Sequence, residues 1–175
     1  MRQSNLSTSL EINNETIRIL GIDPGTGIMG YGIIEKSGSS IKPIKYGCIR
    51  TKPNLNQPDR LSFIYDSLSD IIEKEKPDQV AIESLFFFKN QKTVISVAEA
   101  RGVSIICATK EKIPVFEYTP LQIKQALTGY GRAEKKQIQE MVKIICKLET
   151  CPKPDDAADA LAVAICHSQT NINLK

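Results

Sequence analysis

The 175-residue sequence contains one histidine, no tryptophan and no long hydrophobic run. Because no apolar stretch approaches the roughly 18 to 20 residues that cross a bilayer, we expect no transmembrane helix. A single histidine, His167, cannot build a zinc site with so few partners, and we expect it to be structural. The five cysteines are scattered, odd in number and without a C-x-x-C pair, which argues against a disulfide framework. Any metal chemistry must therefore use oxygen ligands, which select hard cations such as magnesium or manganese.

The N-terminal segment lacks the features of a targeting sequence. Residues 1–16 have no apolar core like that of a signal peptide, and they carry acids that transit peptides avoid. We interpret this segment as a flexible leader and expect a cytoplasmic protein. The remaining length, residues 17–170, suits one domain with a sizeable core.

The pattern of apolar residues predicts an α/β domain with a five-stranded mixed sheet flanked by helices. Three strands open the chain, and turn residues at 37–39 favour an antiparallel meander. Two shorter strands follow, each after a helix, and three helices close the chain. The predicted strands are residues 17–23, 29–35, 41–50, 79–83 and 114–118, and the predicted helices are residues 58–75, 92–111, a short one from 120, 133–148 and 155–168.

The predicted helix at residues 92–111 is apolar on more than one side. Such a helix is usually covered on both sides, one of which should meet the sheet. The second side is either core or a subunit interface, and the small size of the domain favours an interface.

Two acids stand at the ends of predicted buried strands. Asp23 ends the first strand, before a Pro-Gly-Thr-Gly turn, and Glu83 ends the strand QVAIE. In that strand, Val80 and Ile82 should point to one face of the sheet, and Ala81 and Glu83 to the other. The carboxyl ends of parallel strands are where open α/β sheets place their sites, so the two acids are candidate ligands or catalysts.

The last predicted helix carries a second pair of acids. Asp156 and Asp159 are three residues apart and therefore share a helix face. The surrounding alanines would let this helix lie close to the sheet and bring the aspartates near the strand ends. Asp155 is an equal candidate by spacing, since it lies four residues before Asp159, and either Asp155 or Asp156 could serve to cap the helix.

Four clustered carboxylates would repel one another unless cations neutralise them. Two divalent metals held by such a cluster can activate water and stabilise the leaving oxygen in phosphodiester hydrolysis. Two strand-end acids with an acid pair on a late alanine-rich helix therefore predict a nuclease of ribonuclease-H-like fold. A basic stretch adds to this: residues 120–147 hold six Lys or Arg against two Glu, which either binds phosphate or forms a solvated helix face.

Four stretches of the sequence resemble the bacterial RuvC family of crossover-junction endonucleases. They span about residues 17–168, and they read RILGIDPGTGIMGYGIIE, VAIESLFFFKNQKTVISVAEARG, YTPLQIKQALTGYGRAEKKQIQEMV and DDAADALAVAI. The resemblance implies a ribonuclease-H-like fold, a homodimer and magnesium-dependent cleavage of Holliday junctions, with manganese able to substitute. It also implies a branch-migration motor as a partner.

The resemblance assigns roles to individual residues. It carries four catalytic and metal-binding acids onto Asp23, Glu83, Asp156 and Asp159, and so prefers Asp156 to Asp155. Some family members have histidine at the position of Asp156, so this chain should have a four-carboxylate site. The family also contacts junction bases with an aromatic residue and phosphates with basic residues. The matching DNA-binding residues are Phe86 (with Phe87 and Phe88 as alternatives), Lys124 and Lys135, and Lys136 and Arg132 could contribute.

Two other functions were weighed. An actin-like or sugar-kinase-like ATPase also opens with a strand, an acid and a Gly-Thr turn, but it needs two such domains and a second glycine-rich turn. A non-catalytic junction-binding module would be expected to lose acids, and all four are present. The favoured prediction is symmetric, two-metal cleavage of four-way junctions during DNA recombination and repair.

Overall fold

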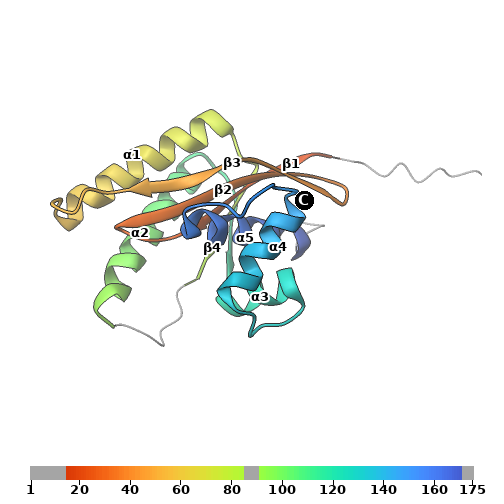
Figure 1. The fold of residues 1–175 in the computed structure, drawn as a ribbon. Coiled ribbons are helices and arrows are strands. Elements are labelled where there is room, and N and C mark those ends of the chain that lie inside the picture. Colours follow the sequence, from red (N-terminus) through yellow and green to blue (C-terminus); the bar gives the residue numbers. More distant parts are fainter. Residues whose placement is uncertain (1–14, 85–90, 171–175) are drawn as a thin grey trace, which may run out of the picture.

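A computed structural model describes residues 15–84 and 91–170 of the chain, and Figure 1 shows its ribbon. The predicted leader at residues 1–16 therefore lies almost wholly outside the described residues, as do Phe86 and its two neighbouring phenylalanines. The strands are β1 (Ile17–Asp23), β2 (Ile28–Ser37), β3 (Ser40–Arg50), β4 (Gln79–Glu83) and β5 (Val115–Tyr118). The helices are α1 (Gln57–Glu75), α2 (Gln91–Lys110), α3 (Pro120–Thr128), α4 (Lys135–Ile145) and α5 (Asp155–Thr170).

The five strands form one mixed sheet in the order β3-β2-β1-β4-β5. The first three strands pair as an antiparallel meander, whereas β4 runs parallel to β1, and β5 parallel to β4. The predicted element order is confirmed, with bounds that differ by a few residues. Because β1 and β4 are parallel neighbours, their carboxyl ends lie at the same edge of the sheet.

The sheet separates two hydrophobic cores. Leu20, Ile22, Val80 and Ile82 are buried with residues of α1 and α2 on one face. Ile19 and Ala81 are buried on the opposite face with α5. The predicted alternation in β4 is therefore correct, and it places the side chains of Asp23 and Glu83 on the α5 side of the sheet.

Local signals fix where the helices begin and end. The Asn56 side chain accepts a hydrogen bond from the Asp59 amide at 2.9 Å, and α1 ends at Lys76 in the left-handed conformation before Pro77. Thr119 and Gln122 form a capping box at the start of α3, where Pro120 occupies the first turn. Such caps satisfy amides that have no partner within the helix.

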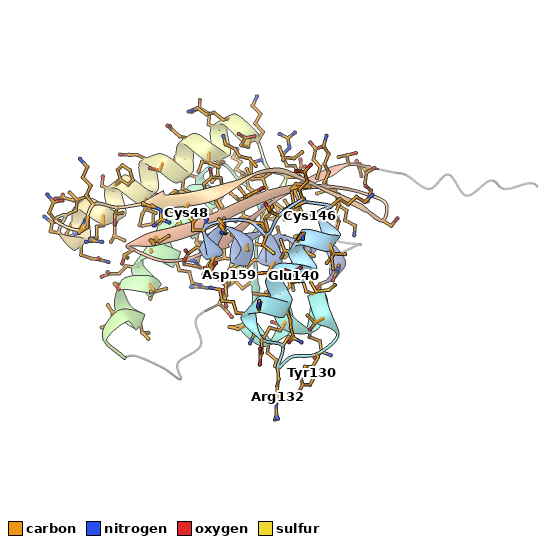
Figure 2. The ribbon with its side chains drawn as sticks, in the orientation of Figure 1. Cys48, Tyr130, Arg132, Glu140, Cys146 and Asp159 are labelled. Atoms are coloured by element: carbon orange, nitrogen blue, oxygen red, sulfur yellow. The ribbon has the colours of Figure 1, made fainter. Side chains whose placement is uncertain are left out.

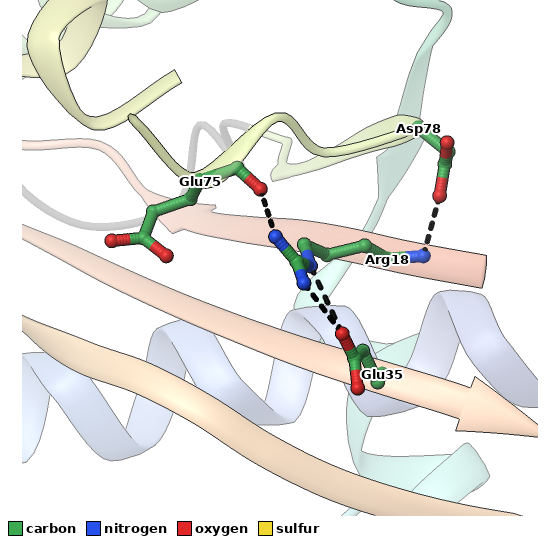
Figure 3. A network of polar contacts seen from close by, with 4 residues as sticks. All are labelled: Arg18, Glu35, Glu75 and Asp78. Carbon is green, nitrogen blue, oxygen red and sulfur yellow. Dashed lines mark hydrogen bonds and ion pairs between the residues drawn. The ribbon is translucent and has the colours of Figure 1, made fainter. Parts of the chain in front are cut away.

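Arg18 fastens the start of β1, at the opposite end of the strand from Asp23 (Figure 3). Its guanidinium donates to Glu35 Oε1 on β2, at 2.6 and 3.2 Å, and to the backbone carbonyl of Glu75. Its amide donates to Asp78 Oδ2 at 2.7 Å. These bonds tie β1 to β2, to the end of α1 and to the turn before β4.

His167 is fully buried, as the structural role predicted for it requires. Its Nδ1 lies 2.7 Å from the Tyr118 hydroxyl, and its Nε2 lies 2.7 Å from Gln79 Oε1. The ring also stacks on Phe116, with centroids 4.4 Å apart. Burial, followed by the charge of Lys36, lowers the pKa of His167 to about 4. The neutral imidazole thus links the end of α5 to β4 and β5.

Helix α2 is covered on one side only. Ala100, Cys107 and Ala108 are buried against the α1 side of the sheet, whereas Ile95 is 71% exposed and Ile106 is 52% exposed. These two isoleucines are eleven residues apart, close to three helical turns, so they lie on one face.

Within the described residues, no helix is both long enough and apolar enough to cross a membrane.

Candidate active site

Helix α5 crosses the sheet at very close range because small residues meet at the crossing. A Cβ atom on Gly30 of β2 would lie 2.0 Å from the carbonyl oxygen of Asp156. A Cβ atom on Gly21 of β1 would lie 2.1 Å from the carbonyl oxygen of Ala160. Any larger residue at either glycine would push the helix away. The close approach predicted from the alanine run is therefore confirmed, and glycines of the sheet make it possible.

This crossing brings the predicted acids together at one edge of the sheet. Asp23 and Glu83 end adjacent strands and are joined by a side-chain hydrogen bond. Asp159 lies close enough to raise the pKa of both, and Asp156 raises the pKa of Asp23. All four side chains are only partly accessible to solvent.

Burial and mutual repulsion hold these carboxyls far from their ordinary behaviour. Burial, then the charges of Glu83, Asp159 and Asp156, raises the pKa of Asp23 to about 8. Burial and the charge of Asp159 raise the pKa of Glu83 to about 7. Burial also raises the pKa of Asp159, against the opposing effect of Lys135. Groups that resist ionisation in this way, side by side, are typical of a site that binds cations or reacts.

Lys135, at the start of α4, is the cation nearest to these acids. Its Nζ lies 2.9 Å from Asp159 Oδ2 and 3.5 Å from Asp155 Oδ2. Partial burial opposes its charge, but the hydrogen bond and charge of Asp159 outweigh this and raise the pKa of Lys135. The ammonium therefore neutralises the acid cluster from the α4 side.

Asp155 and Asp156 point to different surroundings. The Asp155 side chain is 62% exposed and forms the longer ion pair with Lys135. Asp156 is partly buried, and its charge acts on both Asp23 and Cys48. The geometry thus favours Asp156 as the fourth member of the cluster, the choice that spacing left open.

A cleft of about 250 Å³ lies beside the acids, between α3, α4 and α5. Glu83, Asp159, Lys124 and Lys135 supply its polar groups. Its remaining lining is apolar and consists of Pro120, Ile123, Ile138 and Ala162. Two lysines facing two carboxylates across a small cleft can hold a phosphate group next to a cation site. Arg132 and Lys136 do not line this cleft; they line a second groove formed by the end of α3, the turn after it and α4.

Cys48 is a neighbour of the site that sequence reasoning did not single out. Burial, then the charge of Asp156, raises the pKa of the Cys48 thiol to about 11. Strand register could have revealed its position, because Cys48 pairs with Gly30, which in turn pairs with Asp23. The protonated thiol therefore adds no charge to the cluster.

The donor set fits hard divalent cations, since it consists of carboxylate oxygens. Within residues 15–84 and 91–170, however, no three or more His, Cys, Asp or Glu side chains are arranged to hold a metal ion. In the described structure, Asp159 is paired with Lys135, and Glu83 is hydrogen-bonded to Asp23.

The sheet consists of an antiparallel meander extended by two parallel strands, and the acids lie at the strand ends beneath the final helix. This arrangement defines a nuclease of the ribonuclease-H-like class. Residues 19–167 match the model of the family described as crossover junction endodeoxyribonuclease RuvC. The chain belongs to this family and is an endodeoxyribonuclease.

Individual relatives agree with this assignment over most of the chain. Crossover junction endodeoxyribonuclease RuvC of Desulforamulus reducens is 58% identical over 151 residues, which cover 86% of this chain and 93% of the relative. The protein of the same name from Caldanaerobacter subterraneus is 53% identical over 155 residues, covering 89% and 94%.

Solved structures show the same fold. Thermus thermophilus RuvC matches with a TM-score of 0.80 at 32% identity, covering 87% of this chain and 93% of that one. The same protein in complex with a Holliday junction substrate matches with a TM-score of 0.82 at 31% identity over the same shares. The yeast mitochondrial Holliday junction resolvase Ydc2, at 13% identity and a TM-score of 0.61, covering 85% of this chain and 77% of that one, shares the fold.

Proposed function

We propose that the chain resolves Holliday junctions in DNA recombination and repair, by metal-dependent hydrolysis at Asp23, Glu83, Asp156 and Asp159. The observation that carries this proposal is the meeting of two buried strand-end acids with Asp159, beside a cleft that two lysines line. Membership of the crossover junction endodeoxyribonuclease family supports the reaction, and family members are metal-dependent nucleases. The solved complex of Thermus thermophilus RuvC with a Holliday junction supports the substrate.

The four carboxylates would hold two Mg²⁺ ions, for which Mn²⁺ can substitute. When bound, these cations would supply an activated water and charge neutralisation at the scissile phosphate. Asp23 would be the central ligand, since the charges of the other three acids all act on it, and Glu83, Asp156 and Asp159 would complete the set. The products would carry 5′-phosphate and 3′-hydroxyl ends.

The lysines of the cleft hold and orient the substrate in this proposal. Lys124 and Lys135 project into the cleft from α3 and α4, where they can pair with the phosphate that is cut. Arg132 and Lys136 are exposed on the neighbouring surface and would contact phosphates farther along the strand. Phe86, predicted to contact junction bases, lies outside the described residues and stays a prediction.

A homodimer would match the two-fold symmetry of a four-way junction and place one site on each of two opposed strands. The exposed side of α2 supports this, because Ile95 and Ile106 are both more than half exposed and lie on one face of the helix. We also propose a branch-migration motor as partner, on the resemblance alone.

The test compares a synthetic four-way junction with linear duplex of the same sequence, in magnesium. Symmetric nicks restricted to the junction are expected from the unaltered protein. Asp159→Asn should abolish cutting, yet keep junction binding, because it removes one ligand charge and leaves the basic surface intact. Asp155→Asn is the matched control and should still cut, since Asp155 is turned outward. Cutting by Asp159→Asn would remove Asp159 from the site.

A further inference from the structure

Among the described residues, Tyr130 has the most exposed aromatic side chain, and this side chain does not line the active-site cleft. It lies in the turn between α3 and α4 and is 59% exposed. Figure 2 shows Tyr130 and Arg132 together at the end of the α3–α4 pair that lies farthest from the sheet, while Asp159 lies close to the sheet. At this place the ring has a free face on which a flat partner such as a base can stack.

The turn that carries Tyr130 is held on both sides. The Tyr130 amide donates to the Thr128 hydroxyl at 3.2 Å, and that hydroxyl lies 2.8 Å from the Lys124 carbonyl, to which it donates. The Tyr130 carbonyl accepts from the amide of buried Ala133 at 3.2 Å. Gly129 ends α3 with a φ of 70°, a conformation that glycine adopts without strain. The ring is thus presented by a fixed backbone, which lowers the entropy cost of binding.

The groove beside the ring has little net charge. It has a volume of about 810 Å³ and an apolar floor that includes Leu127 and Met141. Its two bases, Arg132 and Lys136, are balanced by two acids, Glu134 and Glu140. Electrostatic attraction for phosphate alone would therefore be weak here, and the flat aromatic face is the feature with binding capacity.

The turn is also continuous with the active-site cleft. The two helices that it joins carry Lys124 and Lys135 into that cleft. A DNA strand whose phosphate lies between these lysines would therefore pass near the α3–α4 turn. Where the arms of a four-way junction unstack at the branch point, the base pairs there present uncovered faces, whereas the interior of a linear duplex presents none.

We propose that Tyr130 stacks on a base exposed at the branch point and so helps the protein select junctions, with Arg132 on an adjacent phosphate. The inference rests on the proposed function, because it assumes that junction DNA occupies the active-site cleft. The α3–α4 turn would then recognise the shape of the junction, and it would take no part in hydrolysis.

The test measures DNA binding in an Asp159→Asn background, which prevents cutting in magnesium. The probes are a four-way junction with 2-aminopurine at the branch point and a linear duplex of matched sequence. Tyr130→Ala should weaken junction binding by roughly 5- to 100-fold, the range for loss of one stacked base, and leave duplex binding unchanged. Tyr130→Phe should keep the junction affinity, since it keeps the ring. It should also keep the change in 2-aminopurine fluorescence that stacking on the branch-point base produces.

Phe63→Ala is the matched control, because Phe63 is an aromatic side chain, 45% exposed, on α1 across the sheet. Thermal unfolding of each variant verifies that it folds. If Tyr130→Ala binds the junction as tightly as its parent, or loses junction and duplex equally, the inference is wrong while the proposed function stands. If Tyr130→Ala keeps its affinity for the junction but no longer binds a branch-migration motor, the turn is a protein-binding surface and the inference is wrong. A parent that binds no junction would overturn the proposed function itself.

Discussion

The ammonium of Lys135 lies 2.9 Å from the carboxylate of Asp159. This ion pair places a cation from α4 against a carboxylate that would help to hold a divalent ion. Lys135 thus neutralises the acids of the metal-free protein. Binding of a metal ion would release Lys135, leaving it free to contact phosphate in the adjoining cleft.

Lys135→Met should therefore lower the stability of the protein while raising its affinity for metal ions. Without a competing cation, the variant should bind Mn²⁺ several-fold more tightly, as measured by calorimetry. In EDTA, it should lose about 0.5 to 1 kcal/mol of unfolding free energy, because the pair is partly exposed to solvent. Lys136→Met is the control and should change neither quantity. Weaker metal binding by Lys135→Met would contradict the role assigned to the ion pair.

The stability of the metal-free protein should fall as the pH rises from 6.5 to 8. The folded-state pKa values of Asp23 and Glu83, about 8 and about 7, lie well above the ordinary values of 3.8 and 4.5. In this window the folded state holds protons that the unfolded state has lost, so each increase in pH favours unfolding, by about 1 kcal/mol per pH unit. Urea unfolding in EDTA measures this slope. Asp23→Asn should flatten it, and saturating magnesium should reverse it; an unchanged slope in Asp23→Asn would exclude Asp23 as its source.

His167 should oppose part of the gain in stability that the two acids give as the pH falls. Its folded-state pKa of about 4 lies below the ordinary value of 6.5, so the unfolded state takes up a proton first as the pH falls between these values. His167→Leu should lack this contribution, and it should cost roughly 1 to 3 kcal/mol at pH 7, since it removes the bonds to Tyr118 and Gln79. Comparison of the two urea-unfolding profiles from pH 7 to 5 tests both effects. Parallel profiles would show that the folded state protonates His167 as readily as the unfolded state does, and would contradict the lowered pKa.

Gly30→Ala should disturb the active site through the backbone. The added methyl would meet the carbonyl of Asp156 at 2.0 Å and force the first turn of α5 away from the sheet. We expect a loss of roughly 2 to 4 kcal/mol in unfolding free energy, together with weaker metal binding. Gly27→Ala is the matched control, because its nearest neighbour would be Arg60 Nη1 at 3.9 Å. Equal stability of the two variants would contradict the close crossing.

The sequence by itself determined the sheet and the first two site residues. The consecutive apolar residues of β1 and β4 are buried on both faces, and the alternation of side chains along a strand fixes the face onto which Asp23 and Glu83 project. Proline and capping residues such as Thr119 fixed where helices begin. These signals are local, since they depend on neighbours within a few residues along the chain.

Only the tertiary structure decided which other groups meet those acids. Spacing left Asp155 and Asp156 equivalent, and the packing of α5 turned one toward Lys135 and the other toward Asp23. It also separated Lys135, in the cleft, from Lys136, which lines a different groove. Such distinctions depend on helix rotation and on the close contact at Gly30, and no periodicity along the chain encodes these quantities.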